Sequence, residues 1–273
     1  MVVAGGAGRR FGSPKQFAEL SGRPVLAWSF DAARAACAGV VLVVPPGGER
    51  AAEVLEHCRG ASAVVAGGQS RSASVRAGLR ALPSGAEVVV VHDAARPLSP
   101  PEVWDRVLAA VAAGADAAVP VVPVTDTVVE VGPGGGSRTL DRSTLSVVQT
   151  PQAFRRAALV AAHAGDPEAT DDAGLVEATG GRVVLVAGDP VNSKITAPID
   201  LLVAAALLSA GMVGLAGDRP VGRSGSGSAP FAPAGGVPGT VPVAAGEAGP
   251  RTPRTAAGEA GPGQLGIARP VGR

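Results

Sequence analysis

A glycine-rich stretch near the beginning of the chain has the residue types of a phosphate-binding loop. Residues 5–16 read Gly-Gly-Ala-Gly-Arg-Arg-Phe-Gly-Ser-Pro-Lys-Gln. Glycines allow backbone N–H groups to approach phosphate oxygens closely, and Arg10 and Lys15 add positive charge there. The stretch matches neither a Walker A loop, which ends in Gly-Lys-Ser/Thr, nor the Gly-x-Gly-x-x-Gly loop that binds dinucleotides. A glycine-rich turn alone is usually only a turn, but combined with these cations it indicates phosphate binding.

A second glycine-containing stretch has two interpretations. Residues 66–74 read Ala-Gly-Gly-Gln-Ser-Arg-Ser-Ala-Ser and lie between a strand-like and a helix-like segment. Small residues and hydroxyl groups at such a junction suit a pocket for a base or a ribose. An ordinary helix N-cap at Ser70 or Ser72 accounts for the pattern equally well.

A carboxylate follows the strand-like segment that ends near residue 91. The stretch 91–97 reads Val-His-Asp-Ala-Ala-Arg-Pro. An acid at the end of a buried strand is costly unless it meets a cation, so Asp93 predicts a metal ion or a paired arginine. An internal ion pair between Asp93 and Arg96 is the simpler alternative.

The stretch 189–196 stands out because its residue types are rare in this chain. Of 24 basic residues only Lys15 and Lys194 are lysines, and Asn192 is the single asparagine. This bias is typical of a GC-rich genome, so each retained lysine is a candidate for a role that arginine does not fill. A lysine close to Thr196 at a strand end favours binding of a phosphate or a phosphate-bearing substrate.

Alternating strand-like and helix-like runs must position these stretches. Apolar, β-branched runs occur at 2–3, 40–44, 63–65, 88–91, 117–124 and 183–186. Helical patterns are predicted at 25–38, 49–58, 72–81, 101–113, 154–164 and 198–209. Continuous apolar strands with intervening helices predict an α/β fold with a mostly parallel sheet covered on both faces. Ligands of such sheets bind at the carboxyl ends of the strands, where the four stretches lie.

Two segments break this alternation and define the predicted domain organisation. Residues 127–148 contain short β-prone pieces around Gly-Pro-Gly-Gly-Gly, which predicts a protruding β-arm. Residues 213–273 are rich in glycine and proline and contain two internal repeats, at 244–250 and 256–262 and at 219–223 and 269–273. We predict one catalytic domain at 1–212 and a disordered tail at 213–273, with a basic docking tail as the alternative.

Composition excludes several classes of protein. The formal net charge of +1 argues against nucleic-acid binding through bulk charge. The sequence contains no run of ~18 apolar residues, so no membrane span is predicted. The first residues do not resemble a signal peptide. Two cysteines and three histidines make a His/Cys metal site improbable. We therefore expect a cytoplasmic protein.

Seven motifs occur in order along residues 1–210. They are the loop 5–15, Gly68 with Ser74, the stretch 91–97, Thr-Asp-Thr at 125–127, Gln-Thr-Pro-Gln at 149–152, Thr-Asp-Asp at 170–172 and Asn-Ser-Lys-Ile-Thr at 192–196. Together they resemble the 2-C-methyl-D-erythritol 4-phosphate cytidylyltransferase family of the non-mevalonate isoprenoid pathway. The resemblance implies a Rossmann-like nucleotidyltransferase fold and a homodimer formed through the β-arm. It also implies transfer of CMP from CTP to the sugar-alcohol phosphate with release of pyrophosphate, assisted by Mg²⁺.

The same resemblance assigns roles to individual residues. It implies contacts to CTP from Gly5, Gly6, Gly8, Gly68, Ser74 and Asp93, with Asp93 also as a metal ligand. Arg10 and Lys15 would stabilise charge on the α-phosphate, and Arg142 and Lys194 would place the substrate phosphate. Arg96, Thr127 and Thr170 would complete the substrate pocket, with arm residues reaching the active site of the partner subunit.

Other functions remain open from the sequence. A related cytidylyltransferase acting on ribitol 5-phosphate would share the CTP loop and differ in the arm and in the pocket around Thr170. A nucleotide-binding protein without turnover is a different class, and the joint presence of Arg10, Lys15, Arg142 and Lys194 disfavours it. Only Met1, Val2 and Val3 precede the glycine-rich loop, so we expect a misplaced start codon or a truncation.

Overall fold

A computed structural model describes residues 1–6, 8, 10–48 and 50–213. The predicted disordered tail therefore lies outside the described residues, apart from Val213. The described helices are α1 (Val25–Ala36), α2 (Ala51–His57), α3 (Arg71–Ala81), α4 (Pro101–Ala112), α5 (Arg156–Ala162), α6 (Asp172–Ala178) and α7 (Pro198–Ser209). Short 3₁₀ turns occur at Lys15–Phe17, Pro46–Gly48 and Arg142–Thr144. Among these residues, no helix is long and apolar enough to cross a membrane.

The described strands form one main sheet and two small hairpins. They are β1 (Val2–Val3), β2 (Glu19–Leu20), β3 (Arg23–Pro24), β4 (Val41–Val44), β5 (Ala63–Ala66), β6 (Val88–Asp93), β7 (Ala117–Pro123), β8 (Val128–Val131), β9 (Ser137–Leu140), β10 (Ser146–Val148), β11 (Gln152–Arg155) and β12 (Val183–Ala187). The main sheet has the order β10-β7-β11-β6-β1-β4-β5, and β12 also pairs with β7. The pairs β1–β4, β1–β6, β4–β5 and β7–β12 are parallel, whereas β10 and β11 run antiparallel to their neighbours. The prediction of a mostly parallel sheet is confirmed.

Helices cover both faces of this sheet because its strands are apolar on both sides. Leu42 and Val90 point into a core that contains Phe30 of α1 and Trp104 of α4. The adjacent Val41 points the other way, into a second core formed with α3, α5 and α6. Burial of each such side chain contributes roughly 1.5–3 kcal/mol to folding. The two cores hold the strand ends, and with them the loops described below, in fixed positions.

The prediction of a helix over 154–164 is wrong at its start. Residues 152–155 form β11, which lies between β6 and β7 and pairs antiparallel with both. Phe154 is fully buried there, and the helix begins only at Arg156. The apolar pattern near Phe154 fits a helix or a buried strand equally well, so pairing with two distant strands decided between them.

Two short elements were also missed by the sequence interpretation. The hairpin β2–β3 turns at Ser21 and Gly22, whose φ angles of 50° and 80° suit a tight two-residue hairpin loop. Helix α6 begins after Asp171, whose side chain accepts a hydrogen bond from Gly174 N. Both carry local signals, a Ser-Gly turn and an aspartate N-cap, that strand and helix periodicity does not register.

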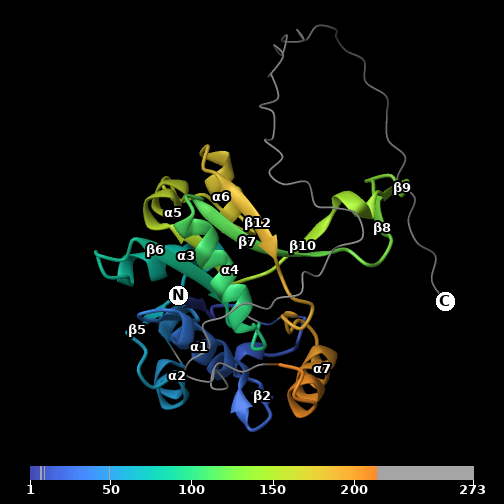
Figure 1. The fold of residues 1–273 in the computed structure, drawn as a ribbon. Helices are drawn as coiled ribbons and strands as arrows, with labels where there is room; N and C mark the ends of the chain where they lie inside the picture. Colours follow the sequence, from blue (N-terminus) through green and yellow to red (C-terminus); the bar gives the residue numbers. More distant parts are fainter. Residues whose placement is uncertain (7, 9, 49, 214–273) are drawn as a thin grey trace, which may run out of the picture. The chain divides into compact units, whose positions relative to one another are not determined.

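The predicted arm is a hairpin carried on two extended strands of the main sheet. The end of β7 pairs antiparallel with β10, with Val121 opposite Val148. Beyond them, β8 and β9 pair with each other, with Val128 opposite Leu140. Figure 1 shows this hairpin projecting beyond the end of β7 and β10. The arm residues Val131 and Val147 are 71% and 49% exposed.

Candidate active site

The loops that follow β1, β5, β6 and β12 enclose one pocket with a volume of about 680 Å³. The chain leaves β1 toward β4 and β5 and later returns to β6 on the opposite side of β1. Such a reversal of strand order separates the flanking loops and leaves a crevice at the carboxyl ends. Several residues predicted to bind ligands line this pocket, namely Gly5, Gly6, Gly8, Arg10, Lys15, Gly68, Ser74, Asp93 and Lys194. The fold thus brings together stretches from the two ends of the domain.

The glycine-rich loop after β1 is closed upon itself. Gly8 adopts a φ of +65°, and a Cβ atom there would lie 1.8 Å from Ser13 O. Gln16 is buried, and its Nε2 donates to Ala4 O at 2.6 Å and to Gly6 O at 3.1 Å. Gln16 therefore fastens the end of the loop to its start. This places Lys15, the first residue of the 3₁₀ turn, at the pocket.

The loop after β5 contains the N-cap that its sequence indicated, and it also lines the pocket. Ser70 is the N-cap of α3, and its Oγ accepts from Ala73 N at 3.0 Å. Ser74 Oγ accepts from Gly68 N at 3.2 Å and donates to Ser70 O at 2.8 Å. A Cβ atom at Gly68 would lie 2.4 Å from the Cβ of Ala73, so the loop can pack closely against α3 only with glycine there. Ser72 is not the cap, because its hydroxyl bonds the backbone of Ala169.

Asp93, at the end of β6, is paired with one cation from the loop after β12 and one from the start of α3. Its Oδ2 accepts from Lys194 Nζ at 2.6 Å, and its Oδ1 lies 3.8 Å from Arg71 Nε. Burial alone would raise the pKa of this carboxyl, but the charges of Lys194 and Arg71 outweigh it and hold the pKa well below its usual range. Asp93 is therefore a carboxylate at neutral pH.

The alternative of an internal pair between Asp93 and Arg96 is wrong. The guanidinium of Arg96 points behind the pocket, where it donates to Asn192 O at 2.7 Å and to Val148 O at 3.1 Å. Arg96 thus connects the loop that carries Lys194 with the end of β10.

A buried histidine fixes the backbone at Asp93. Asp93 N donates to Thr150 Oγ1 at 3.0 Å, and Thr150 Oγ1 lies 3.1 Å from His92 Nδ1. The other ring nitrogen, Nε2, is 3.1 Å from Arg96 O, a carbonyl that can only accept, so Nε2 carries the proton. Burial lowers the pKa of His92 to about 3, which keeps the ring neutral. The Asp93 backbone is held by a chain of directed hydrogen bonds.

The cations at the pocket form one electrostatic group. The pKa of Lys15 is lowered, first by burial and then by the charge of Lys194, while Asp93 acts in the opposite direction. Arg10 lines the same pocket and contributes to lowering the pKa of Lys15. Positive groups that repel one another in this way gain stability when a polyanion binds between them.

Four predicted residues lie outside this pocket within a single chain. Arg96 is buried behind it, as described above. Arg142 is at the base of the arm, and its Nη1 donates to Thr125 O. Thr127 and Thr170 are exposed, the first just before β8 and the second just before α6. The chain alone does not bring Arg142, Thr127 or Thr170 to the pocket.

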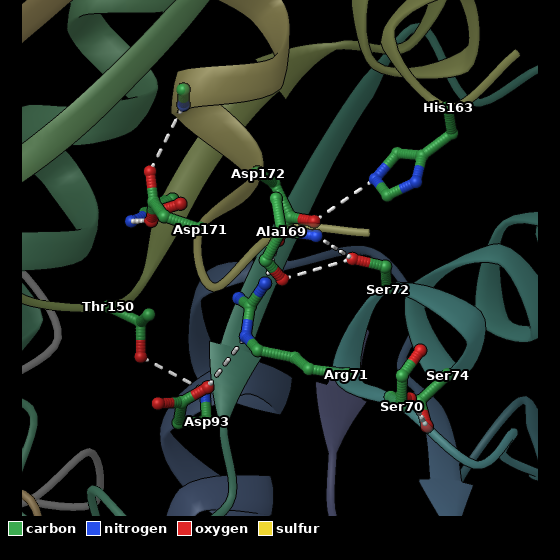
Figure 2. Close-up of polar contacts among 12 residues, drawn as sticks. Ser70, Arg71, Ser72, Ser74, Asp93, Thr150, His163, Ala169, Asp171 and Asp172 are labelled. Atoms are coloured by element: carbon green, nitrogen blue, oxygen red, sulfur yellow. Dashed lines mark hydrogen bonds and ion pairs between the residues drawn. The ribbon is translucent and has the colours of Figure 1, made fainter. Parts of the chain in front are cut away.

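The lining residues that were not singled out from the sequence include Arg71 and Gln16. Arg71, the first residue of α3, borders the pocket and contacts Asp93 (Figure 2). Gln16 also borders it and supports the glycine-rich loop. A glutamine next to a retained lysine and an arginine within the 66–74 stretch were the available signals. Arginine is the common cation of this chain and glutamine occurs five times, so composition did not mark them as it marked Lys194 and Asn192.

A glycine-rich loop, a cluster of cations and one carboxylate at the switch point of a parallel sheet define a nucleotide-binding α/β protein whose ligands carry phosphate. Comparison with known sequences makes the family specific. The family model for 2-C-methyl-D-erythritol 4-phosphate cytidylyltransferase (IspD) matches residues 1–210, and the chain belongs to this family.

Individual relatives agree over the same region. The chain is 46% identical to the 2-C-methyl-D-erythritol 4-phosphate cytidylyltransferase of Frankia casuarinae over 215 residues, covering 77% of this chain and 80% of that protein. It is 45% identical to the Nocardia farcinica enzyme of the same name, covering 76% and 92%. The crystal structure of the Thermus thermophilus enzyme matches with a TM-score of 0.64 at 39% identity, covering 76% of this chain and 97% of that one.

Proposed function

We propose that this protein transfers CMP from CTP to 2-C-methyl-D-erythritol 4-phosphate, producing 4-diphosphocytidyl-2-C-methyl-D-erythritol and pyrophosphate. The observation that carries the proposal is the convergence of the glycine-rich loop, Lys15 and the Asp93–Lys194 pair on one pocket. Family membership names the substrates, and the pocket provides the groups that their chemistry requires.

The nucleotide would bind along the loops after β1 and β5. Gly5, Gly6 and Gly8 offer backbone N–H groups with no side chain between them and a phosphate. Gly68, which has no side chain, lies just before α3, and Ser74, whose side chain is small, lies in the first turn of this helix. Both would leave room for the cytidine. Asp93 would complete the CTP contacts at the end of β6.

The reaction requires charge stabilisation more than acid–base catalysis. A phosphate oxygen of the sugar phosphate attacks the α-phosphorus of CTP, and the bond from that phosphorus to the bridging oxygen breaks. The electron pair of this bond leaves with pyrophosphate, so no proton has to move. Because both reactants are anions, the protein must gather cations and hold the two reactants in line. Arg10 and Lys15 would stabilise the charge that develops at the α-phosphate.

Lys194 would hold the phosphate of the second substrate. It is paired with Asp93 at the edge of the pocket, and its side chain is 39% exposed. A phosphate dianion arriving there would compete with Asp93 for the ammonium group. Arg142, Thr127 and Thr170 would contribute further contacts, and Arg96 would support Lys194 through its bond to Asn192 O.

A divalent cation, which we propose to be Mg²⁺, fits the residues present. Mg²⁺ commonly uses one or two carboxylates together with substrate phosphates and water. Among the lining residues that the structure describes, Asp93 is the one carboxylate, and it is ionised. When bound, the cation would neutralise charge on the triphosphate oxygens. Asp93 would hold it from the side of β6.

We also propose a cytoplasmic homodimer in which the arm completes the site of the partner subunit. The exposed apolar side chains Val131 and Val147 on the arm suit a protein interface. Arg142 and Thr127 lie on this arm and outside the pocket of their own chain. Cys37 and Cys58 are both free thiols, which supports a reducing compartment.

Mixing two inactive variants tests the shared site. Lys15→Ala removes a residue of the pocket, and Arg142→Ala removes a residue of the arm. If each arm serves the pocket of the partner subunit, a mixed dimer contains one site in which both residues are intact. After subunit exchange at equal concentrations we expect about a quarter of wild-type turnover, because half of the dimers are mixed and half of their sites are complete. If both residues act within one chain, the mixture stays as inactive as the separate variants.

A pyrophosphate-release assay tests the activity itself. We expect release from CTP with 2-C-methyl-D-erythritol 4-phosphate, no release with ribitol 5-phosphate, and loss of release in EDTA that added Mg²⁺ reverses. Release only with ribitol 5-phosphate would identify the related cytidylyltransferase. CTP binding without release from either sugar phosphate would indicate a binding protein and overturn the proposed transfer.

A further inference from the structure

A fully buried carboxylate lies behind the nucleotide pocket, at the first residue of α6. Asp172 Oδ2 accepts from Arg71 Nη1 at 2.6 Å, and Oδ1 accepts from His163 Nε2 at 3.0 Å. The side chains of Asp172 and His163 are 0% and 2% exposed. An ionised carboxylate is costly to bury unless its oxygens have partners, so this pairing is not exchanged for water. Asp172 therefore holds Arg71 in one orientation.

The other side of Arg71 faces the active-site carboxylate. Arg71 Nε lies 3.8 Å from Asp93 Oδ1, while Lys194 Nζ lies 2.6 Å from Asp93 Oδ2. Figure 2 shows the Arg71 guanidinium between Asp93 and Asp172. Arg71 thus bridges a carboxylate of the pocket and one of the interior.

The two cations on Asp93 differ in how firmly they are held. The side chain of Lys194 is 39% exposed, and it is proposed to turn toward the substrate phosphate. When it turns, Asp93 loses that partner. Arg71 is 23% exposed and is anchored by Asp172, which has no exposure at all. If Lys194 turns in this way, Arg71 is the cationic partner that Asp93 keeps.

The same anchor connects the start of α3 with the loop before α6. Ser72 Oγ donates to Ala169 O at 3.1 Å and accepts from Ala169 N at 3.0 Å (Figure 2). Arg76, one turn further along α3, donates to Pro167 O at 2.8 Å. The loop that carries Thr170 and the helix that borders the nucleotide pocket consequently form one connected unit.

We propose that Asp172 is a positioning residue of the nucleotide site, which acts through Arg71 to hold the Asp93 carboxylate in place for CTP. This rests on the proposed function, because it assumes that CTP binds beside Asp93. His163 completes the arrangement by occupying the second oxygen of Asp172, so that the first remains directed at Arg71.

A double-mutant cycle on CTP affinity tests this proposal in the full-length protein. By calorimetry, Asp172→Asn and Arg71→Gln should each weaken CTP binding on the order of tenfold, as is typical when a residue that orients a site is removed. The double variant should bind CTP no more weakly than Arg71→Gln alone, because Asp172 acts only through Arg71. An undiminished effect of Asp172→Asn in the Arg71→Gln background would overturn the proposal.

Asp171→Asn is the matched control. Asp171 caps α6 through Gly174 N and accepts from Gln152 Nε2 at 2.6 Å, and it does not line the pocket. This variant perturbs the same helix start but should leave CTP affinity near wild type. Equal losses in Asp171→Asn and Asp172→Asn would assign Asp172 to general stability of α6 and overturn the proposal.

Two further outcomes are separable. If Asp172→Asn does not fold, Arg71→Lys replaces it, since lysine keeps the charge but loses the fork that spans two carboxylates. Normal CTP affinity of Arg71→Lys would overturn the proposal. Failure of the wild-type protein to bind CTP would overturn the proposed function as well, whereas normal binding by wild type and by both single variants would overturn this inference alone.

Discussion

Replacing Lys15 with alanine is expected to lower kcat by about 10²–10³, the usual effect of losing one charged contact to a transition state. Lys15 projects into the pocket from the 3₁₀ turn that closes the glycine-rich loop, and burial together with Lys194 already lowers its pKa. A bound triphosphate would relieve that repulsion, and most strongly where charge accumulates on the α-phosphate. Steady-state kinetics with saturating CTP and sugar phosphate measure the effect.

The separation of kcat from KM makes this prediction specific. Backbone N–H groups of the loop remain in Lys15→Ala, so the KM for CTP should change much less than kcat. Arg34→Ala is the control, because Arg34 is an exposed cation on α1 that does not line the pocket. Near-normal turnover of Lys15→Ala would remove Lys15 from the mechanism.

Replacing Lys194 with alanine is expected to raise the KM for 2-C-methyl-D-erythritol 4-phosphate roughly ten- to hundredfold. A hydrogen bond to a charged group contributes about 1.5–3 kcal/mol, which corresponds to that range. Asp93 keeps Arg71 as a partner in this variant, so its carboxylate stays ionised and placed. The affinity for CTP, measured without the second substrate, should therefore remain close to that of the wild type.

A conservative variant distinguishes position from charge. Lys194→Arg retains the charge but offers a planar fork in place of a compact ammonium group, so we expect only partial recovery of the KM. An unchanged KM for the sugar phosphate in Lys194→Ala would contradict the role of Lys194 in substrate positioning. A large loss of CTP affinity would instead indicate that Lys194 supports the nucleotide through Asp93.

The structure brings together the segments whose local chemistry was distinctive in the sequence. The glycine-rich loop with Arg10 and Lys15, and the rare-residue stretch with Lys194, were predicted as ligand-binding segments and line one pocket. The parallel sheet with helices on both faces was also predicted correctly. The loop signals are contained within a few consecutive residues, and the sheet follows from simple runs that alternate along the chain, so one sequence is enough to read both.

The sequence interpretation was least successful where the outcome depended on competition between distant groups. The ambiguous run at Phe154 became a strand because β6 and β7 provide hydrogen-bonding edges on both sides of it. Asp93 was expected to meet a metal ion or an arginine, with Arg96 as the near neighbour. The expected arginine partner is Arg71 and not the neighbouring Arg96, and the shorter contact comes from Lys194, 101 positions away.

The sequence by itself determined which residue types would do the chemistry and which family the chain resembles, because glycine loops and strand periodicity act over short distances. Only the tertiary structure decided which charges meet. Lys194 reaches Asp93 because β12 and β6 end at the same edge of the sheet. Arg71 is held between two carboxylates because the first residue of α3 meets the first residue of α6 beside the end of β6. Electrostatic partners depend on distance in space and on burial, and neither quantity is encoded locally in the order of residues.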